Sequence, residues 1–212
     1  MIYLDYSATT PVNEEVLDSF NKVCREFIGN PNSLHKLGVK SKQLEESATK
    51  QIANIMGVEP NEIIYTSGSS ESNNLAIKGI ALKYLNRGKK IITTNLEHSS
   101  IYGPIGYLQK LGFEVEFVKT NEHGLVDINH LESLIDDDVI LVTIASVNSE
   151  TGLVQPVERI AEMLQDKKCF LNIEEKWKKL WISYTKNKKT WEKFLESLVI
   201  IIAFVFVYYF FI

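Results

Sequence analysis

The sequence has 212 residues, of which 45% are hydrophobic and 24% charged, and its formal net charge is −4 at pH 7. This length allows one domain with a buried core, and the mild charge gives no reason to expect nucleic acid as a partner. The two cysteines, Cys24 and Cys169, lie outside any Cys-x-x-Cys spacing, so they predict neither a disulfide framework nor a metal site and fit a reducing cytosol.

The first part of the chain predicts two helices. Asn13 is a suitable N-cap for a helix over residues 14–27, whose apolar residues recur on one stripe. Glycine and proline in residues 29–32 end this helix. A second helix is expected over residues 39–56, with Gly57 at its end.

Strands and helices alternate after residue 60. We expect strands at residues 62–66, 90–95, 114–119, 139–146 and 169–173, and helices at residues 70–87, 101–111, 129–135 and 157–165. Strands separated by helices predict an α/β fold, in which a mainly parallel sheet carries helices on both faces.

Polar loops directly follow three of these strands, at residues 66–70, 95–99 and 146–150. In open parallel sheets, ligands bind beyond the carboxyl ends of the strands. We therefore expect the three loops to converge on one edge of the sheet and to form the binding site there.

The loop at residues 66–70 has the composition of a phosphate site. The first N–H groups of the following helix lack carbonyl partners and can hold a dianion. Ser69 or Ser70 is a natural N-cap, the hydroxyls of Ser67, Ser69 and Ser70 add donors, and Glu71 suits the first turn. An ordinary capped helix after a Ser/Gly turn is the alternative that this string favours by itself.

Five segments, taken in order and spacing, match the N-terminal half of one enzyme family. They are Ile2–Pro11, Gly29–Gly38, Ile63–Asn74, Leu96–Ser100 and Ser146–Pro156. From Met1 to about Asn172 the chain resembles the cysteine desulfurases, which are fold-type I enzymes of the class V aminotransferase family that depend on pyridoxal phosphate.

The resemblance implies a role for four residues. Ser69 and Ser70 would bind the cofactor's phosphate, His98 would stack on its pyridine ring and act as an acid or base, and Asn148 would donate to its ring oxygen. Imidazole is flat and titrates near neutrality, and an amide N–H2 suits a phenolate acceptor. Without the resemblance, a loop histidine is more often solvated, and Asn148 would only shape a turn before Thr151.

The resemblance also implies an activity. The intact enzyme would remove sulfur from L-cysteine, giving L-alanine and an enzyme-bound persulfide for iron–sulfur cluster or thio-cofactor assembly. It would be a cytoplasmic homodimer that passes sulfur to scaffold or acceptor proteins. Selenocysteine lyase and other class V aminotransferases are the alternatives within the same fold.

The composition changes near residue 172, where the resemblance ends. Residues 173–197 are rich in lysine and contain every tryptophan of the chain, and residues 198–212 are apolar and uncharged. The family's Schiff-base lysine, nucleophilic cysteine and ring-nitrogen aspartate have no match. We thus expect residues 1–172 to be a partial large domain with weak, non-covalent cofactor binding and no turnover.

Two explanations remain for the residues after 172. Out-of-frame translation of an A/T-rich gene would supply Lys, Asn, Ile, Phe and Tyr, which dominate this part. A membrane anchor would make the chain a non-catalytic tethered or partner-binding remnant. The apolar run is shorter than the roughly 20 residues of a spanning helix, which favours the first explanation.

Overall fold

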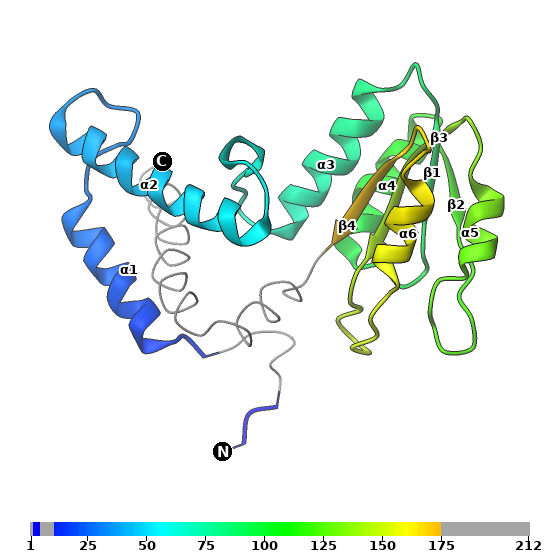
Figure 1. Cartoon of the computed structure of the whole chain (residues 1–212), viewed down its shortest axis with the longest axis horizontal. Coiled ribbons are helices and arrows are strands. Elements are labelled where there is room, and N and C mark those ends of the chain that lie inside the picture. The colour runs from blue at the N-terminus through cyan, green and yellow to red at the C-terminus, as the bar shows by residue number, and fades with distance from the viewer. Residues whose placement is uncertain (1, 5–10, 175–212) are drawn as a thin grey trace. The chain divides into compact units, whose positions relative to one another are not determined.

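The structure is a computed structural model that describes residues 2–4 and 11–174 (Figure 1). The described residues fall into two compact units, one up to Tyr65 and one from Thr66 onward. Apart from Ile173 and Glu174, the basic segment and the apolar tail lie outside the described residues. No helix in the described ranges is long and apolar enough to cross a membrane.

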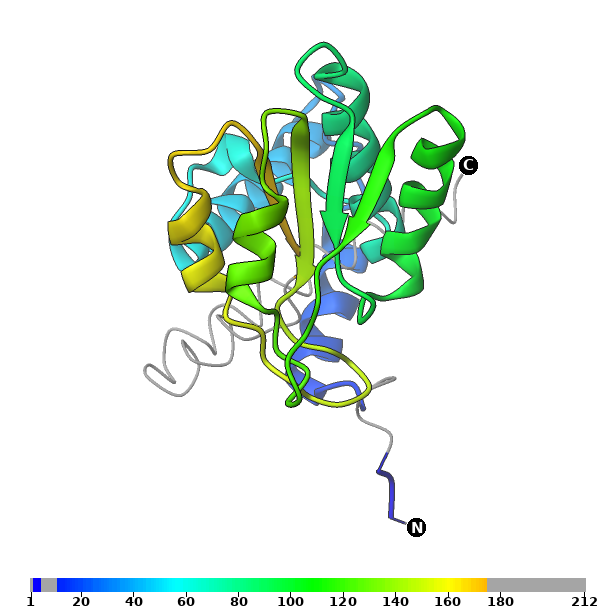
Figure 2. The same cartoon turned by 90° about the vertical axis from the view of Figure 1, so that its right-hand side faces the viewer.

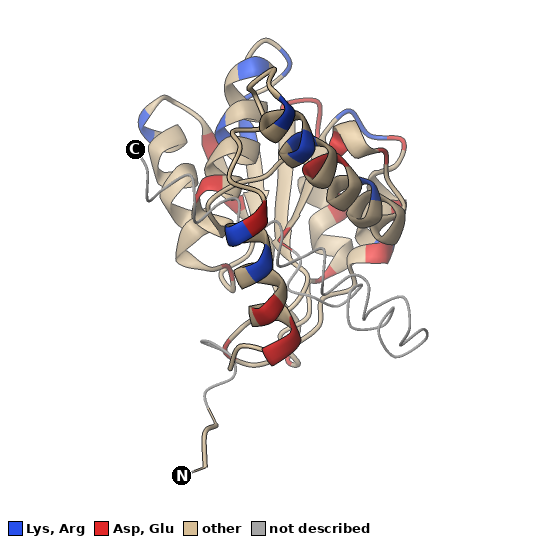
Figure 3. Cartoon of the chain, turned by 90° about the vertical axis from the view of Figure 1, so that its left-hand side faces the viewer, with Lys and Arg blue, Asp and Glu red and all other residues tan. Residues whose placement is uncertain are grey.

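Helix α1 (Glu14–Glu26) begins where the sequence predicts. The Asn13 side chain caps it and accepts a hydrogen bond from the N–H of Glu15 at 2.9 Å. Acidic residues occupy the first turn and Arg25 the last turn. Figure 3 colours the acidic residues red and the basic residues blue. This order of charges stabilises the helix dipole, so local signals account for the helix.

Helix α2 (Lys36–Met56) starts three residues earlier than the expected start at residue 39. His35 is its N-cap, and the Nδ1 atom of His35 accepts from the N–H of Gly38 at 3.2 Å. Histidine is not among the common N-cap residues, which explains the missed start. The helix ends as predicted, with Gly57 in the left-handed conformation at φ 70°.

The expected strand at residues 62–66 is wrong. Pro60–Glu62 forms a short 3-10 helix, η1, and residues 63–66 form no strand within the described part of the chain. Ile64 is 71% exposed. The β-branched run has strand propensity, but a strand also needs a neighbouring strand to pair its backbone groups.

The second unit contains a sheet of four parallel strands in the order β2-β1-β3-β4 (Figures 1 and 2). They are β1 (Lys90–Thr93), β2 (Glu114–Phe117), β3 (Val139–Ala145) and β4 (Phe170–Glu174). Every residue of β3 is buried, as expected for an apolar strand covered on both sides. The predicted α/β fold is confirmed.

Two apolar clusters place helices on both faces of this sheet. Helices α3 (Ser69–Lys83) and α4 (Ser99–Lys110) contribute to one cluster, and α5 (Ile128–Leu134) and α6 (Val157–Leu164) to the other. Ile91 belongs to the first cluster and Ile92 to the second, because successive strand residues point to opposite faces. The two packed layers thus fix strands β1 and β3, from whose ends two of the expected site loops leave.

Candidate functional site

The first turn of α3 contains the two expected phosphate-binding residues, Ser69 and Ser70. The N-cap is Gly68, which makes no side-chain capping bond, so the expectation that Ser69 or Ser70 caps the helix is wrong. Both serines instead lie inside the helix and are exposed. An uncapped helix start retains backbone N–H groups without helical partners, which can bind an anion.

Ser67, the third expected donor, already bonds to Glu71. Its N–H and its hydroxyl both donate to Glu71 Oε2 at 2.6 Å. The hydroxyl bond and then the backbone bond lower the pKa of the Glu71 carboxyl. A negative charge therefore lies beside the helix start, and Ser67 would have to leave Glu71 before it could bind a ligand.

The loop after β1 is fastened to the end of β3 by Glu97, which is 8% exposed. Its oxygens accept from the N–H of Ala145 at 3.1 and 2.9 Å, and the hydroxyl of Thr94 donates to Oε1 at 2.7 Å. Burial raises the pKa of Glu97 to about 7, the bonds from Thr94 and Ala145 oppose this, and the charge of Glu174 adds to it. Glu97 can thus gain or lose a proton near neutral pH.

Asn148, in the loop after β3, also joins these two parts of the chain. Its Nδ2 donates to the carbonyl of Leu96 at 2.8 Å, and its Oδ1 accepts from the N–H of Glu150 and of Thr151 at 3.0 and 2.9 Å. The turn-forming alternative for Asn148 is therefore present in the structure. An amide nitrogen carries two hydrogens, so the bond to Leu96 leaves one available to a ligand.

His98 is the N-cap of α4, which begins at Ser99, two residues before the start expected at residue 101. Its Nδ1 accepts from the N–H of Ser100 at 3.2 Å and lies 2.9 Å from the Ser100 hydroxyl oxygen. That oxygen accepts from Nδ2 of Asn73, on α3, at 3.0 Å. Asn73 lies one helical turn after Ser69 and Ser70, so hydrogen bonds connect the starts of the two helices.

A small pocket brings two of the four expected site residues together. Its lining consists of Leu96, His98, Ala145, Val147, Asn148, Ser149 and Glu174. Ser69 and Ser70 are not part of this lining. Oε2 of Glu174 is buried and has no hydrogen-bond partner within the described residues.

Sequence reasoning missed Glu97 and Glu174. Glu97 could have been noticed as an acidic residue in the short loop that follows a buried strand and precedes His98. For the strand that contains Glu174, sequence reasoning notes only that the family's ring-nitrogen aspartate has no match. The position of Glu174 opposite Ala145 in the sheet depends on strand register, which the sequence does not show.

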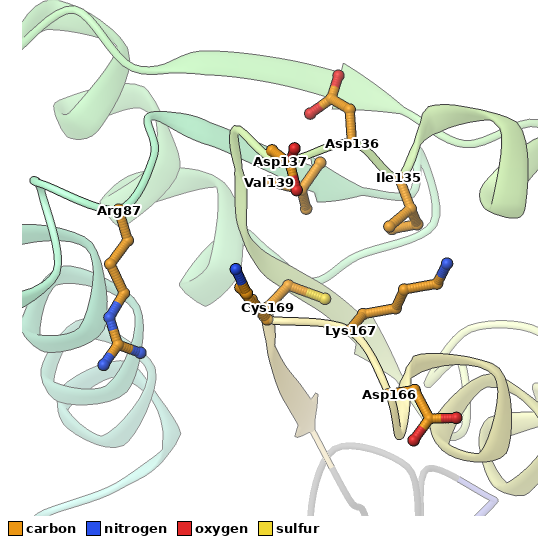
Figure 4. Close-up of a pocket in the computed structure, with 9 residues that line it drawn as sticks. Arg87, Ile135, Asp136, Asp137, Val139, Asp166, Lys167 and Cys169 are labelled. Atoms are coloured by element: carbon orange, nitrogen blue, oxygen red, sulfur yellow. The ribbon is translucent and has the colours of Figure 1, made fainter.

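A larger pocket lies at the other end of the strands (Figure 4). It is lined by Arg87, Ile135, Asp136, Asp137, Val139, Asp166, Lys167, Lys168 and Cys169. These residues precede or begin β1, β3 and β4, so this pocket lies at the amino ends of the strands, away from the predicted site. Burial raises the pKa of the Cys169 thiol, which disfavours a reactive thiolate. Among the residues the structure covers, no group of three or more His, Cys, Asp or Glu could hold a metal.

Comparison with known proteins gives one consistent result. The family model described as Aminotransferase class-V matches residues 2–174. Cysteine desulfurase IscS 1 from Archaeoglobus fulgidus is 39% identical over 164 residues, which cover 77% of this chain and 43% of that protein. Cysteine desulfurase IscS from Photorhabdus laumondii is 42% identical over 192 residues, which cover 88% and 48%.

Solved structures give the same result. A NifS-like protein has a TM-score of 0.76 and 36% identity over 79% of this chain and 46% of its own. SspA in complex with cysteine has a TM-score of 0.77 and 35% identity over 82% and 50%. The chain thus spans half or less of the length of each of these four proteins.

Proposed function

Because the chain belongs to the class-V aminotransferase family, we propose that it carries part of the pyridoxal phosphate site of a cysteine desulfurase. The observation that carries this proposal is that His98 and Asn148 line one small pocket, together with Glu174, whose Oε2 has no hydrogen-bond partner among the described residues. The whole enzyme would take sulfur from L-cysteine and release L-alanine. The names of the relatives support this choice of substrate.

The chemistry of the available donors fits the cofactor. A phosphate dianion suits the exposed hydroxyls of Ser69 and Ser70 and the free N–H groups at the start of α3. His98 offers a flat ring, and Asn148 retains one amide hydrogen for the ring oxygen. Each of the four residues can therefore bind one chemical group of the cofactor.

Oε2 of Glu174, which is buried and without a partner among residues 2–4 and 11–174, gives a separate test of fit. A buried carboxylate oxygen without a partner is unusual in folded proteins and needs an explanation. A protonated ring nitrogen would supply the missing donor. Pyridoxal phosphate, when bound, supplies an electron sink for the substrate's α-carbon.

We infer that this chain binds the cofactor without a covalent bond and does not turn over substrate. The family's Schiff-base lysine and nucleophilic cysteine have no match in the described residues, where Cys24 and Cys169 are half-buried free thiols. The roles left to this chain are to hold the phosphate, to orient the ring and to accept its N–H. Free thiols also support a cytoplasmic location. Homodimerisation and transfer of sulfur to acceptor proteins belong to the same proposal.

The proposal is tested by equilibrium dialysis of the purified chain with pyridoxal phosphate. We expect weak binding that His98→Ala, Asn148→Ala and the double variant Ser69→Ala/Ser70→Ala each weaken by about three- to tenfold, which is the effect of one or two lost hydrogen bonds or ring contacts. Asn121→Ala is the matched control, because Asn121 shapes an exposed turn by accepting from the N–H of His123 and of Leu125.

Two results would contradict the proposal. Binding that the site variants leave as strong as in the Asn121→Ala control would place the cofactor elsewhere. Release of alanine from cysteine, with a borohydride-stable cofactor adduct, would show that the chain provides its own lysine and is active.

A further inference from the structure

We propose that Glu97 is the positioning residue of this site, because its buried carboxylate fastens the loop that carries His98 to the strand end that precedes Asn148. Only the identity of the ligand rests on the proposed function. The positioning role itself rests on contacts within the chain.

The contacts of Glu97 use both of its oxygens. The N–H of Ala145 donates to both oxygens, and the hydroxyl of Thr94 donates to Oε1. A carboxylate is an acceptor on both oxygens, whereas a glutamine keeps one acceptor oxygen for the N–H of Ala145 and would direct its N–H2 to the Thr94 hydroxyl, which can also accept. Burying a carboxylate is costly unless it is hydrogen-bonded, and here the hydrogen bonds go to the two elements that border the pocket.

The backbone of Glu97 is held as well. Its N–H donates to the Tyr102 hydroxyl oxygen at 3.2 Å, and that hydroxyl donates to the carbonyl of Thr94 at 3.1 Å. His98 is the next residue and begins α4. Because both the side chain and the backbone of Glu97 are held, the position of the His98 side chain is held as well.

A second hydrogen bond also joins the two loops, and its side chain comes from the loop after β3. Asn148 reaches from the loop after β3 to the carbonyl of Leu96, while Glu97 reaches from the loop after β1 to Ala145. The two bonds close a ring between the loops. If the Glu97 bond is lost, the Asn148 bond alone must hold the two loops together, and the pocket lining becomes free to open.

Hydrogen exchange measured by mass spectrometry on the full chain tests this ring directly. We expect Glu97→Ala to speed exchange by about tenfold or more in peptides covering residues 94–100 and 145–149, since a bond to a charged acceptor is lost. Glu97→Gln keeps one acceptor oxygen and should restore most of the protection. This rescue by the conservative variant separates positioning from a simple loss of packing.

Asp127→Ala is the matched control. The Asp127 carboxylate also accepts from two backbone donors, the N–H groups of Asn129 and His130, at the start of α5. Its loss should destabilise the chain without faster exchange at residues 94–100 and 145–149. Exchange that rises equally across the whole chain in Glu97→Ala and in the control would overturn the proposal.

Dialysis with pyridoxal phosphate provides the second readout. Affinity should fall by about tenfold in Glu97→Ala and stay within about threefold of the unsubstituted chain in Glu97→Gln and Asp127→Ala. Equal affinity in all four proteins would overturn the link between Glu97 and ligand binding. If the unsubstituted chain binds no cofactor while the local exchange effect is present, the proposed function fails and the positioning role of Glu97 stands.

Discussion

The two ends of the same parallel strands are held together in different ways. At the carboxyl ends, buried or half-buried side chains such as Glu97 and Asn148 bond to backbone groups of the neighbouring loop. At the amino ends, Lys90 Nζ meets Asp136 Oδ2 at 2.9 Å, and the Asp136 side chain is 54% exposed. The first kind of contact is shielded from water, and the second is screened by it.

This difference indicates at which end of the strands the sheet tolerates substitutions and changes of pH. A bond between buried partners leaves an unsatisfied group when one partner is removed, whereas an exposed charge is solvated again by water. We therefore expect substitutions and pH to act strongly at the carboxyl ends and weakly at the amino ends.

The largest expected effect is a pH dependence that comes from Glu97. Its pKa rises from a usual value near 4.5 to about 7 on folding, so the folded chain binds this proton more tightly than the unfolded chain does. The free energy of unfolding should thus increase as pH falls from about 8 to about 5, by up to about 3 kcal/mol. Urea unfolding at both pH values measures this change.

Glu97→Gln is the control for this titration. The variant keeps the other ionisable groups, so the difference between the two chains isolates Glu97 from Glu174 and from the rest. The variant should lose most of the stabilisation between pH 8 and pH 5. If both chains respond equally, Glu97 does not titrate in this range.

The next effect is expected for Asn148→Ala. The substitution removes the bond to Leu96 and the acceptor for two N–H groups of the following turn, and should cost about 2 kcal/mol of unfolding free energy. Asn121→Ala, in an exposed turn of similar design, should cost less. Thermal or urea unfolding compares them, and a larger cost for Asn121→Ala would contradict the comparison.

A smaller effect is expected for Tyr102→Phe. The lost hydroxyl bonds to the backbone of Thr94 and Glu97, and its removal should cost about 1 kcal/mol. Tyr107, also on α4, is 47% exposed, and its ring faces the Lys78 ammonium group, which Phe would retain. Equal unfolding midpoints for Tyr102→Phe and Tyr107→Phe would show that the hydroxyl does not hold the loop.

The smallest effect is expected at the amino ends, for Asp136→Asn. The Lys90 ammonium holds the pKa of the Asp136 carboxyl below its usual value, but this pair is open to solvent on the Asp136 side. Any loss of stability should shrink further as salt is added. A loss that exceeds that of Tyr102→Phe, or that persists in high salt, would break the comparison.

Local signals explain which elements could be predicted from the sequence. Asn13 and Gly57 mark the ends of helices through bonds to residues a few positions away. The continuous apolar run of β3 indicates that this strand is buried. His35 and His98 also cap helices, but histidine is too rarely an N-cap to be read as one. The expected starts of α2 and α4 are therefore three and two residues too late.

Long-range pairing explains what could not be predicted. The expected strand at residues 62–66 has the right residues but no neighbouring strand within the described part of the chain. The bond between Glu97 and Ala145 joins residues 48 positions apart, so no local pattern shows it. His98 and Asn148 were found through the resemblance, and their shared pocket was found only in the folded chain.

The cap at His98 has a consequence for proton transfer. The Ser100 backbone N–H can only donate, so Nδ1 of His98 must be without a hydrogen while it caps α4. The neutral ring therefore carries its hydrogen on Nε2, and that nitrogen can donate a hydrogen bond but has no lone pair with which to take up a proton. For His98 to remove a proton through Nε2, the ring would have to change tautomer and uncap the helix, so base catalysis there would require the first turn of α4 to loosen.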